Sequence, residues 1–223
     1  MASATGRSSS SRSNVAGGAR NGPRPKRGEG ARGLLNRGNV GRPVNRSGSS
    51  YERELKGVLQ GEEGALRRYR RYAHTVDELR LLDQLTKSPF LVVRAAGSHG
   101  FDLVALRDGL ILPVEVKTSA QPVIHFAAAS GRAREQFESL RDQTRKANLV
   151  LLYAFRWIGS GEDDPWRIFA ADEGPPTGFA RLLARRTPRV ENTPHGNQVL
   201  RWDRGRPLLD LLGHAMAILG GLS

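Results

Sequence analysis

The segment FDLVALRDGLILPVEVK, residues 101–117, contains two apolar runs joined by Asp108-Gly109. Asp-Gly is a preferred pair for the central positions of a type I′ turn, which joins two antiparallel strands. We therefore predict a hairpin with strands over 101–106 and 110–117. Counting outward from the turn places Asp102 opposite Glu115, at a position without ladder hydrogen bonds where facing Cα atoms are only about 4.5 Å apart. Lys117 lies two residues further along and points to the same side.

Apolar side chains flank these carboxylates on both faces of the predicted hairpin, so we expect a buried strand pair. Like charges that face each other in a buried hairpin are destabilising. A cation between Asp102 and Glu115 would remove the repulsion, and oxygen ligands without sulfur favour Mg²⁺, with Mn²⁺ as a substitute, over zinc. Lys117 would add a positive charge suited to a phosphate under attack. The pattern indicates metal-assisted phosphodiester hydrolysis.

Two features of the segment leave alternatives open. The spacing Asp-x₁₂-Glu-x-Lys is also typical of strand-end carboxylates that form solvated ion pairs with a lysine. Pro113 lacks a ladder donor, and a bulge there would shift the register by one residue and separate the two carboxylates.

Helical and strand patterns continue on both sides of the hairpin. We expect helices over 51–59, 62–72, 76–87, 133–147 and 208–219, and further strands over 90–94, 149–157 and 166–171. This order predicts an α/β or α+β domain with a central mixed sheet of about five strands flanked by helices.

The positive charge of the chain is concentrated at its N-terminus. The 223 residues carry a formal charge of +13, and residues 1–50 alone hold ten basic residues and one acid. Residues 1–50 are rich in Arg, Gly and Ser and contain little that could be buried, which predicts a disordered basic tail. We expect residues 51–223 to form the folded domain, and a polyanion to be the partner.

The composition excludes several classes of protein. Without cysteine, the chain cannot build a disulfide scaffold, a zinc ribbon or a thiol active site. No apolar run approaches the about 20 residues of a membrane span, so we expect no membrane association. A cytoplasmic, DNA-associated location is the prediction.

Four stretches of the sequence, in this order, resemble the archaeal-type Holliday junction resolvases of the PD-(D/E)XK nuclease superfamily. They are YEREL (51–55), VVRAAGS (92–98), DLVA (102–105) and VEVK (114–117). The resemblance covers most of residues 51–219 and leaves out the basic tail. It implies a restriction-endonuclease-like fold and a homodimeric, Mg²⁺-dependent endonuclease. Such an enzyme resolves four-way DNA junctions in recombination and repair by two symmetric incisions.

The resemblance also implies roles for individual residues. Asp102, Glu115 and Glu52 match the metal ligands, Lys117 matches the charge-stabilising lysine, and Ser98 matches a serine of the active-site loop. Together these five side chains form the predicted catalytic group.

Arginines at four positions are expected to contact DNA. Arg94 matches a strand-end arginine near the scissile phosphate, and Arg53 lies on the exposed side of the first helix. Arg132 and Arg134 begin the basic helix, whose arginine bias suits phosphate contact.

The third metal ligand has an alternative. In the family the helix glutamate and the strand arginine are close in sequence, whereas 41 residues separate Glu52 from Arg94 here, including a helical insertion over 61–88. Glu78 begins the helix that leads to Arg94 and would take this role if the first helix were displaced. Ser49-x-x-Glu52 also fits a helix capping box. We favour Glu52 because it matches more positions of the pattern.

Two other functions remain open. One is a nuclease of the same superfamily that acts on duplex or flap DNA. The other is a basic protein that binds DNA and performs no chemistry.

Overall fold

The computed structural model describes residues 48–94, 100–161, 163–175 and 177–220. Most of the predicted basic tail lies outside the described residues, so its disorder stays a prediction. Gly48–Ser50, which the sequence assigned to the tail, instead form the first turn of a helix. None of the helices in the described ranges has both the length and the apolar character needed to span a membrane.

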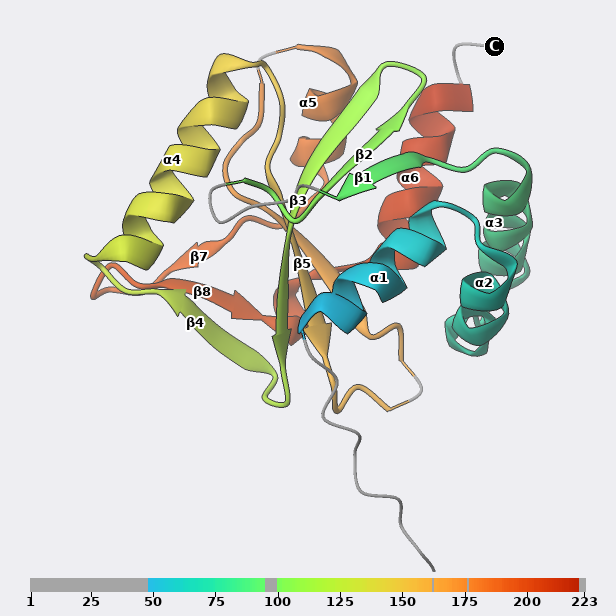
Figure 1. Ribbon diagram of the computed structural model, residues 1–223, viewed down its shortest axis with the longest axis horizontal. Coiled ribbons are helices and arrows are strands. Elements are labelled where there is room, and N and C mark those ends of the chain that lie inside the picture. Colours follow the sequence, from blue (N-terminus) through green and yellow to red (C-terminus); the bar gives the residue numbers. More distant parts are fainter. Residues whose placement is uncertain (1–47, 95–99, 162, 176, 221–223) are drawn as a thin grey trace, which may run out of the picture. The chain divides into compact units, whose positions relative to one another are not determined.

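Helices occupy the start of the described chain and strands follow them (Figure 1). The first half contains α1 (Gly48–Leu59), α2 (Glu63–Tyr69), the 3₁₀ turn η1 (Arg70–Tyr72), α3 (Val76–Lys87), β1 (Leu91–Arg94), β2 (Leu103–Arg107), β3 (Leu110–Ser119) and β4 (Val123–Ala127). The second half contains α4 (Arg132–Lys146), β5 (Leu152–Trp157), β6 (Trp166–Ala170), α5 (Gly178–Arg185), β7 (Glu191–Asn192), β8 (Gln198–Arg201), η2 (Trp202–Arg204), β9 (Arg206–Pro207) and α6 (Leu208–Gly220).

The central sheet has six strands in the order β1-β2-β3-β5-β6-β9. Strands β3 and β5 are parallel and the other neighbours are antiparallel, so the predicted mixed α/β architecture is confirmed. A second sheet, β4-β8-β7, was not predicted from the sequence, and neither were α5 and β9. Strands β7 and β9 have two residues each, which is too short for a detectable pattern of alternation.

The predicted hairpin is confirmed, and so is its register over the paired residues, but β2 begins at Leu103, so the expected ladder pair of Asp102 with Glu115 lies beyond the paired residues. Asp108 and Gly109 have φ values of 47° and 80°, the left-handed values that a type I′ turn requires. Arg107 pairs with Leu110, and the ladder continues without a shift to Leu103 and Val114. Strand β5 pairs with β3 only from Val114 onward. Pro113, which precedes Val114, has no backbone N–H, but β5 does not pair with β3 at this residue. The proline therefore removes no hydrogen bond between β3 and β5.

Two layers cover the central sheet. Figure 1 shows α1, α3 and α6 on one side, and α4 with the small sheet on the other. The hairpin is fully buried only on the first side, where Leu103 and Leu112 lie. On the opposite side, Leu106 and Ile111 are half-buried, which corrects the expectation of a strand pair buried on both faces. Helix α4 packs beside β4 and leaves this end of the hairpin open.

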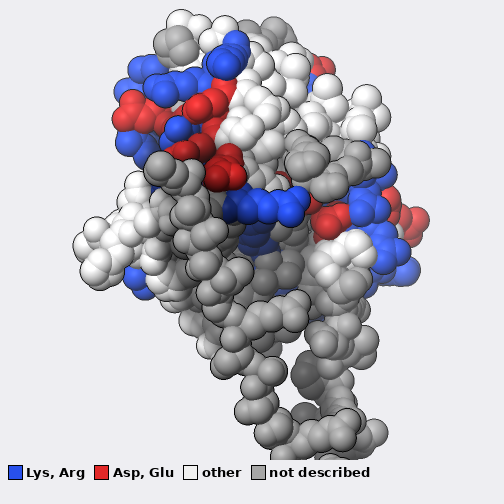
Figure 2. Space-filling view, turned by 60° about the vertical axis from the view of Figure 1, so that its left-hand side comes forward, with Lys and Arg blue, Asp and Glu red and all other residues white. Residues whose placement is uncertain are grey.

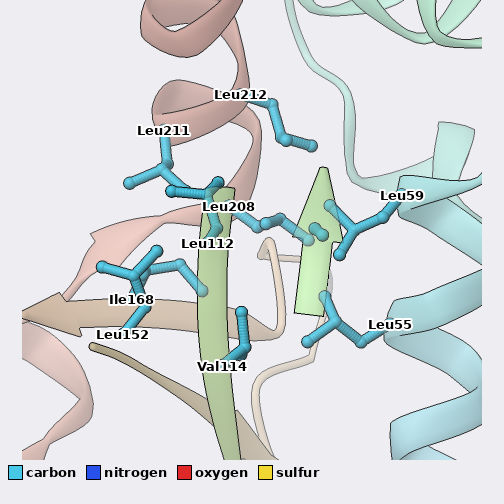
Figure 3. Close-up of a pocket in the computed structure, with 10 residues that line it drawn as sticks. Leu55, Leu59, Leu112, Val114, Leu152, Ile168, Leu208, Leu211 and Leu212 are labelled. Carbon is cyan, nitrogen blue, oxygen red and sulfur yellow. The ribbon is translucent and has the colours of Figure 1, made fainter. Parts of the chain in front are cut away.

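Leucines of α1 and α6 meet over the middle of the sheet. Figure 3 shows Leu55 and Leu59 of α1 facing Leu208 and Leu212 of α6, with Leu112 of β3 between them. These side chains surround a cavity of only about 20 Å³ with an apolar lining, so it offers a water molecule no hydrogen-bond partner. Helix α1 is thus held to the sheet by close apolar packing.

Replacement of Leu55 tests this packing. Leu55 is 1% exposed, so Leu55→Ala should lower the free energy of unfolding by about 2–5 kcal/mol through lost contacts and an enlarged cavity. The control Leu79→Ala removes a leucine that is 36% exposed. It should change the free energy of unfolding by about 0.5 kcal/mol or less. Urea denaturation followed by circular dichroism measures the free energy of unfolding of both variants. If Leu55→Ala lowered it as little as Leu79→Ala does, α1 would not depend on this contact.

Candidate active site

Asp102 and Glu115 lie together where the hairpin ladder ends. Asp102 directly precedes Leu103, the first residue of β2, and its Oδ2 accepts a hydrogen bond of 2.7 Å from the backbone N–H of Val116. This bond holds the Asp102 carboxylate against β3, beside Glu115, which is 5% exposed. The structure therefore brings the two predicted carboxylates together.

Lys117 satisfies only part of the Glu115 carboxylate. Its Nζ lies 2.9 Å from Glu115 Oε1 in a partly buried ion pair. The second oxygen, Oε2, is buried and has no hydrogen-bond partner among the described residues. A buried carboxylate oxygen without a donor is costly. This oxygen is therefore available to a cation.

A small hollow adjoins Glu115. It has a volume of about 80 Å³ and lies between β3, β5 and α4, where Lys117, Tyr153 and Gln136 form part of its wall. This volume exceeds what a single water molecule requires. The hollow thus leaves room for a small ligand beside Glu115, which is the one carboxylate among its lining residues.

The pKa shifts of the side chains in the site indicate an excess of negative charge. Burial raises the pKa of Glu115, and the Asp102 charge raises it further, against a lowering by Lys117. Burial also raises the pKa of Asp102, while the Val116 hydrogen bond and Lys117 lower it. The pKa of the Tyr153 hydroxyl is raised by burial and by both carboxylates. Lys117 alone does not compensate the negative charge gathered here.

Glu52 joins this group from helix α1. Its charge is among the causes that raise the pKa of both Asp102 and Glu115. Its Oε2 lies 2.5 Å from Nη2 of Arg94, at the end of β1. In their present positions, no three acidic or histidine side chains of the described residues are arranged to hold a metal ion. Glu52 is bound to Arg94 instead.

Glu78, the alternative ligand, has a structural role at the start of α3. Its Oε2 accepts hydrogen bonds from the backbone N–H groups of His74 and Thr75, at 2.8 and 2.9 Å, and completes a capping box with Thr75. Ser49 lies within α1 and not before it, so the alternative capping box around Glu52 does not begin that helix.

The other predicted residues lie apart from the carboxylates or outside the described residues. Ser98 belongs to the segment 95–99, which the structure does not describe. Arg53 is exposed, and its Nε donates a 3.1 Å hydrogen bond to the Ser49 carbonyl. Arg132 is exposed at the start of α4. Arg134 instead forms an ion pair, in which its Nε lies 2.6 Å from Oε1 of Glu138. Figure 2 shows a face on which basic and acidic side chains are mixed.

Sequence reasoning missed two polar side chains beside Glu115. Tyr153 stands next to it because β5 pairs with β3 in a parallel register that places these two residues opposite each other. Gln136 reaches the hollow from α4. No local sequence signal reveals either neighbour, because parallel pairing is set by the long connection through β4 and α4.

One curated protein is similar in sequence to part of the chain. No family model matches the chain. The chain is similar to the crossover junction endodeoxyribonuclease Hjc of Methanocaldococcus jannaschii, with 37% identity over 76 residues. This match spans 34% of the chain and only 38% of that protein. A solved structure of Hjc, a Holliday junction resolvase from Archaeoglobus fulgidus, matches 66% of the chain and 96% of its own length, with a TM-score of 0.38 and 20% identity.

Glu115→Gln tests whether the positive charge near Glu115 is too small to compensate its carboxylate. Because folding raises its pKa, Glu115 contributes most to stability below the ordinary value of about 4.3, and this contribution is lost as the pH rises through the raised pKa. Glutamine keeps an acceptor for Lys117 without the charge. In chelator at pH 7, the variant should melt about 2–4 °C higher than the wild type, and the difference should shrink towards pH 4.

The matched control is Glu135→Gln on the exposed side of α4, which should leave the melting temperature unchanged. Mg²⁺ should raise the melting temperature of the wild type more than that of Glu115→Gln, since binding to the folded state stabilises it. A variant that melts at or below the wild-type temperature in chelator at pH 7 would refute the interpretation.

Proposed function

We propose, from the similarity to a crossover junction endodeoxyribonuclease, that this chain is a metal-dependent endonuclease that cuts four-way DNA junctions in recombination and repair. The observation that carries the proposal is the half-buried Asp102 beside the buried Glu115, with Lys117 on one Glu115 oxygen and no described partner on Glu115 Oε2. Under this proposal the protein would act on DNA in the cytoplasm.

The metal would be held by three carboxylates. Asp102 and Glu115 would bind Mg²⁺, or Mn²⁺ with similar ligand preferences, and Glu52 would be the third ligand. The bound ion would supply Lewis acidity for water attack on a phosphodiester. Glu52 is bound to Arg94, so its release would free a guanidinium at the same place. Arg94 would then bind the scissile phosphate through paired N–H donors.

Lys117 and Ser98 would complete the chemistry. As water attacks phosphorus and the bond to the leaving oxygen breaks, negative charge grows on the phosphate oxygens. The Lys117 ammonium, 2.9 Å from Glu115 Oε1, would stabilise that charge. Ser98 would contact the same phosphate. Arg53, Arg132 and Arg134 would bind DNA further from the cut.

A homodimer is part of the proposal. Leu91 and Val93 of the edge strand β1 are 64% and 51% exposed. They share a sheet face with the half-buried Leu106 and Ile111, which is also the face of Glu115. Contiguous exposed apolar surface is typical of an interaction site. A second copy on this face would bury it and provide two active sites related by two-fold symmetry, as two symmetric cuts require.

Cleavage of a four-way junction tests the proposed function. The full chain is incubated with an immobile junction and with a linear duplex of the same arm sequence, in Mg²⁺ and in chelator, and the products are mapped on both strands. Paired symmetric cuts in the junction alone are expected, and they should disappear in chelator. Glu115→Ala should reduce the cleavage rate by at least about 100-fold, while junction binding stays intact.

Each other outcome points to a different function. Cleavage of both substrates would indicate a general nuclease that acts on duplex or flap DNA. Tight junction binding without cleavage in any metal would indicate a non-catalytic DNA-binding protein. Unchanged cleavage by Glu115→Ala would refute the assigned site.

Glu52→Ala and Glu78→Ala, compared side by side, test the third ligand. Glu52→Ala should abolish cleavage because it removes a metal ligand. Glu78→Ala should keep cleavage and lower the free energy of unfolding by about 0.5–2 kcal/mol, because it breaks the capping box of α3. Cleavage rates and urea denaturation give both readouts. Full cleavage by Glu52→Ala would exclude Glu52 from the metal site.

A further inference from the structure

A large basic hollow lies between α1, α2 and η1. Its volume is about 720 Å³. Helix α1 contributes Arg53 and Glu54 to its wall, whereas Glu52 points to the carboxylate site. The arginines that line it are Arg53, Arg67, Arg68, Arg71 and Arg156, and the acids are Glu54 and Glu62. Three of the five arginines come from the predicted insertion 61–88, for which the family resemblance provides no role.

The positive charge of this basic hollow is largely uncompensated. Glu54 lies 3.0 Å from Nε of Arg156, so these two charges offset each other. No ion pair within the described ranges involves Arg67, Arg68 or Arg71. All three of these side chains are exposed at the rim. They are therefore accessible to an anionic partner.

The wall that carries these arginines is firmly attached to the core. Tyr69 of α2 is 2% exposed, and its hydroxyl donates a hydrogen bond to Asp164. The Asp164 carboxylate also accepts backbone hydrogen bonds of 3.0 Å from Trp166 of β6 and Leu209 of α6. The guanidinium of Arg71 lies 4.6 Å from the centre of the Tyr72 ring. A basic surface held in this way loses little entropy when it binds a ligand.

The arrangement of the arginines suits a run of phosphates. Arg67 of α2 and Arg71 of η1 both line the basic hollow. Guanidinium groups bind phosphate oxygens through paired N–H donors. Helix α1 carries Glu52 towards the carboxylate site and Arg53 towards the basic hollow, so the two sites lie on different sides of this helix.

We propose that the basic hollow binds the phosphate backbone of a DNA arm while another strand lies at the carboxylate site. The insertion would thus provide a second DNA contact. This inference rests on the proposed function only in taking DNA as the substrate, and it concerns affinity and not the chemical step.

The test removes the exposed charges from the full chain. The variant Arg67→Gln/Arg68→Gln/Arg71→Gln is compared with Arg185→Gln/Arg186→Gln, two adjacent exposed arginines at the end of α5. Affinity for a four-way junction is measured by fluorescence anisotropy in chelator from 50 to 200 mM salt. The triple variant should bind at least about tenfold more weakly, with a salt slope lower by about one for each lost phosphate contact. The control should match the wild type.

Cleavage in Mg²⁺ separates this proposal from the proposed function. At saturating junction the triple variant should cut at the wild-type rate and positions, with the loss confined to KM. Unchanged affinity and salt slope would overturn the role of the basic hollow even if the wild type cuts junctions. Wild-type binding without cleavage would overturn only the proposed function. Thermal melting checks folding, and Arg68→Gln alone repeats the test if the triple variant melts at a lower temperature.

Discussion

The register of the β2–β3 hairpin determines the relative positions of Asp102, Glu115 and Lys117. A shift of one residue would turn Asp102 or Glu115 to the opposite face of the sheet. Asp108 and Gly109 prevent the shift, since both adopt the left-handed backbone of a tight turn. The repulsion between the two carboxylates is then reduced by the backbone N–H of Val116 and by the ammonium of Lys117. One buried oxygen is left for a cation.

Helix α1 connects this register to the rest of the structure. Leu55 packs into the core between the sheet and α6, which fixes the rotation of the helix. That rotation directs Glu52 to Arg94 and the carboxylates, and turns Arg53 and Glu54 towards the basic hollow. A single apolar stripe thus orients two polar surfaces with different proposed roles, because side chains one and two residues away on a helix point in different directions.

Features with a local physical cause could be predicted from the sequence. The turn, the pairing of the hairpin, the apolar stripe of α1 and the bounds of α3 follow from residue preferences and periodicity over a few turns, and the structure confirms them. Features that depend on residues far apart in the chain could not be predicted from the sequence. The small second sheet, the sixth central strand and Tyr153 beside Glu115 all depend on pairings across long connections. The role of Glu78 as a cap became clear only with its hydrogen bonds to His74 and Thr75.

The sequence by itself determined the hairpin and the identity of its acidic pair, because turn geometry and the two-residue period of a strand act over short distances. Only the tertiary structure decided what surrounds that pair. Packing of α1 against α6 brought Glu52 to Arg94, parallel pairing of β5 brought Tyr153 to Glu115, and Tyr69 joined the insertion to the core. These contacts arise from apolar burial and hydrogen bonds between segments far apart in the chain, which no local pattern encodes.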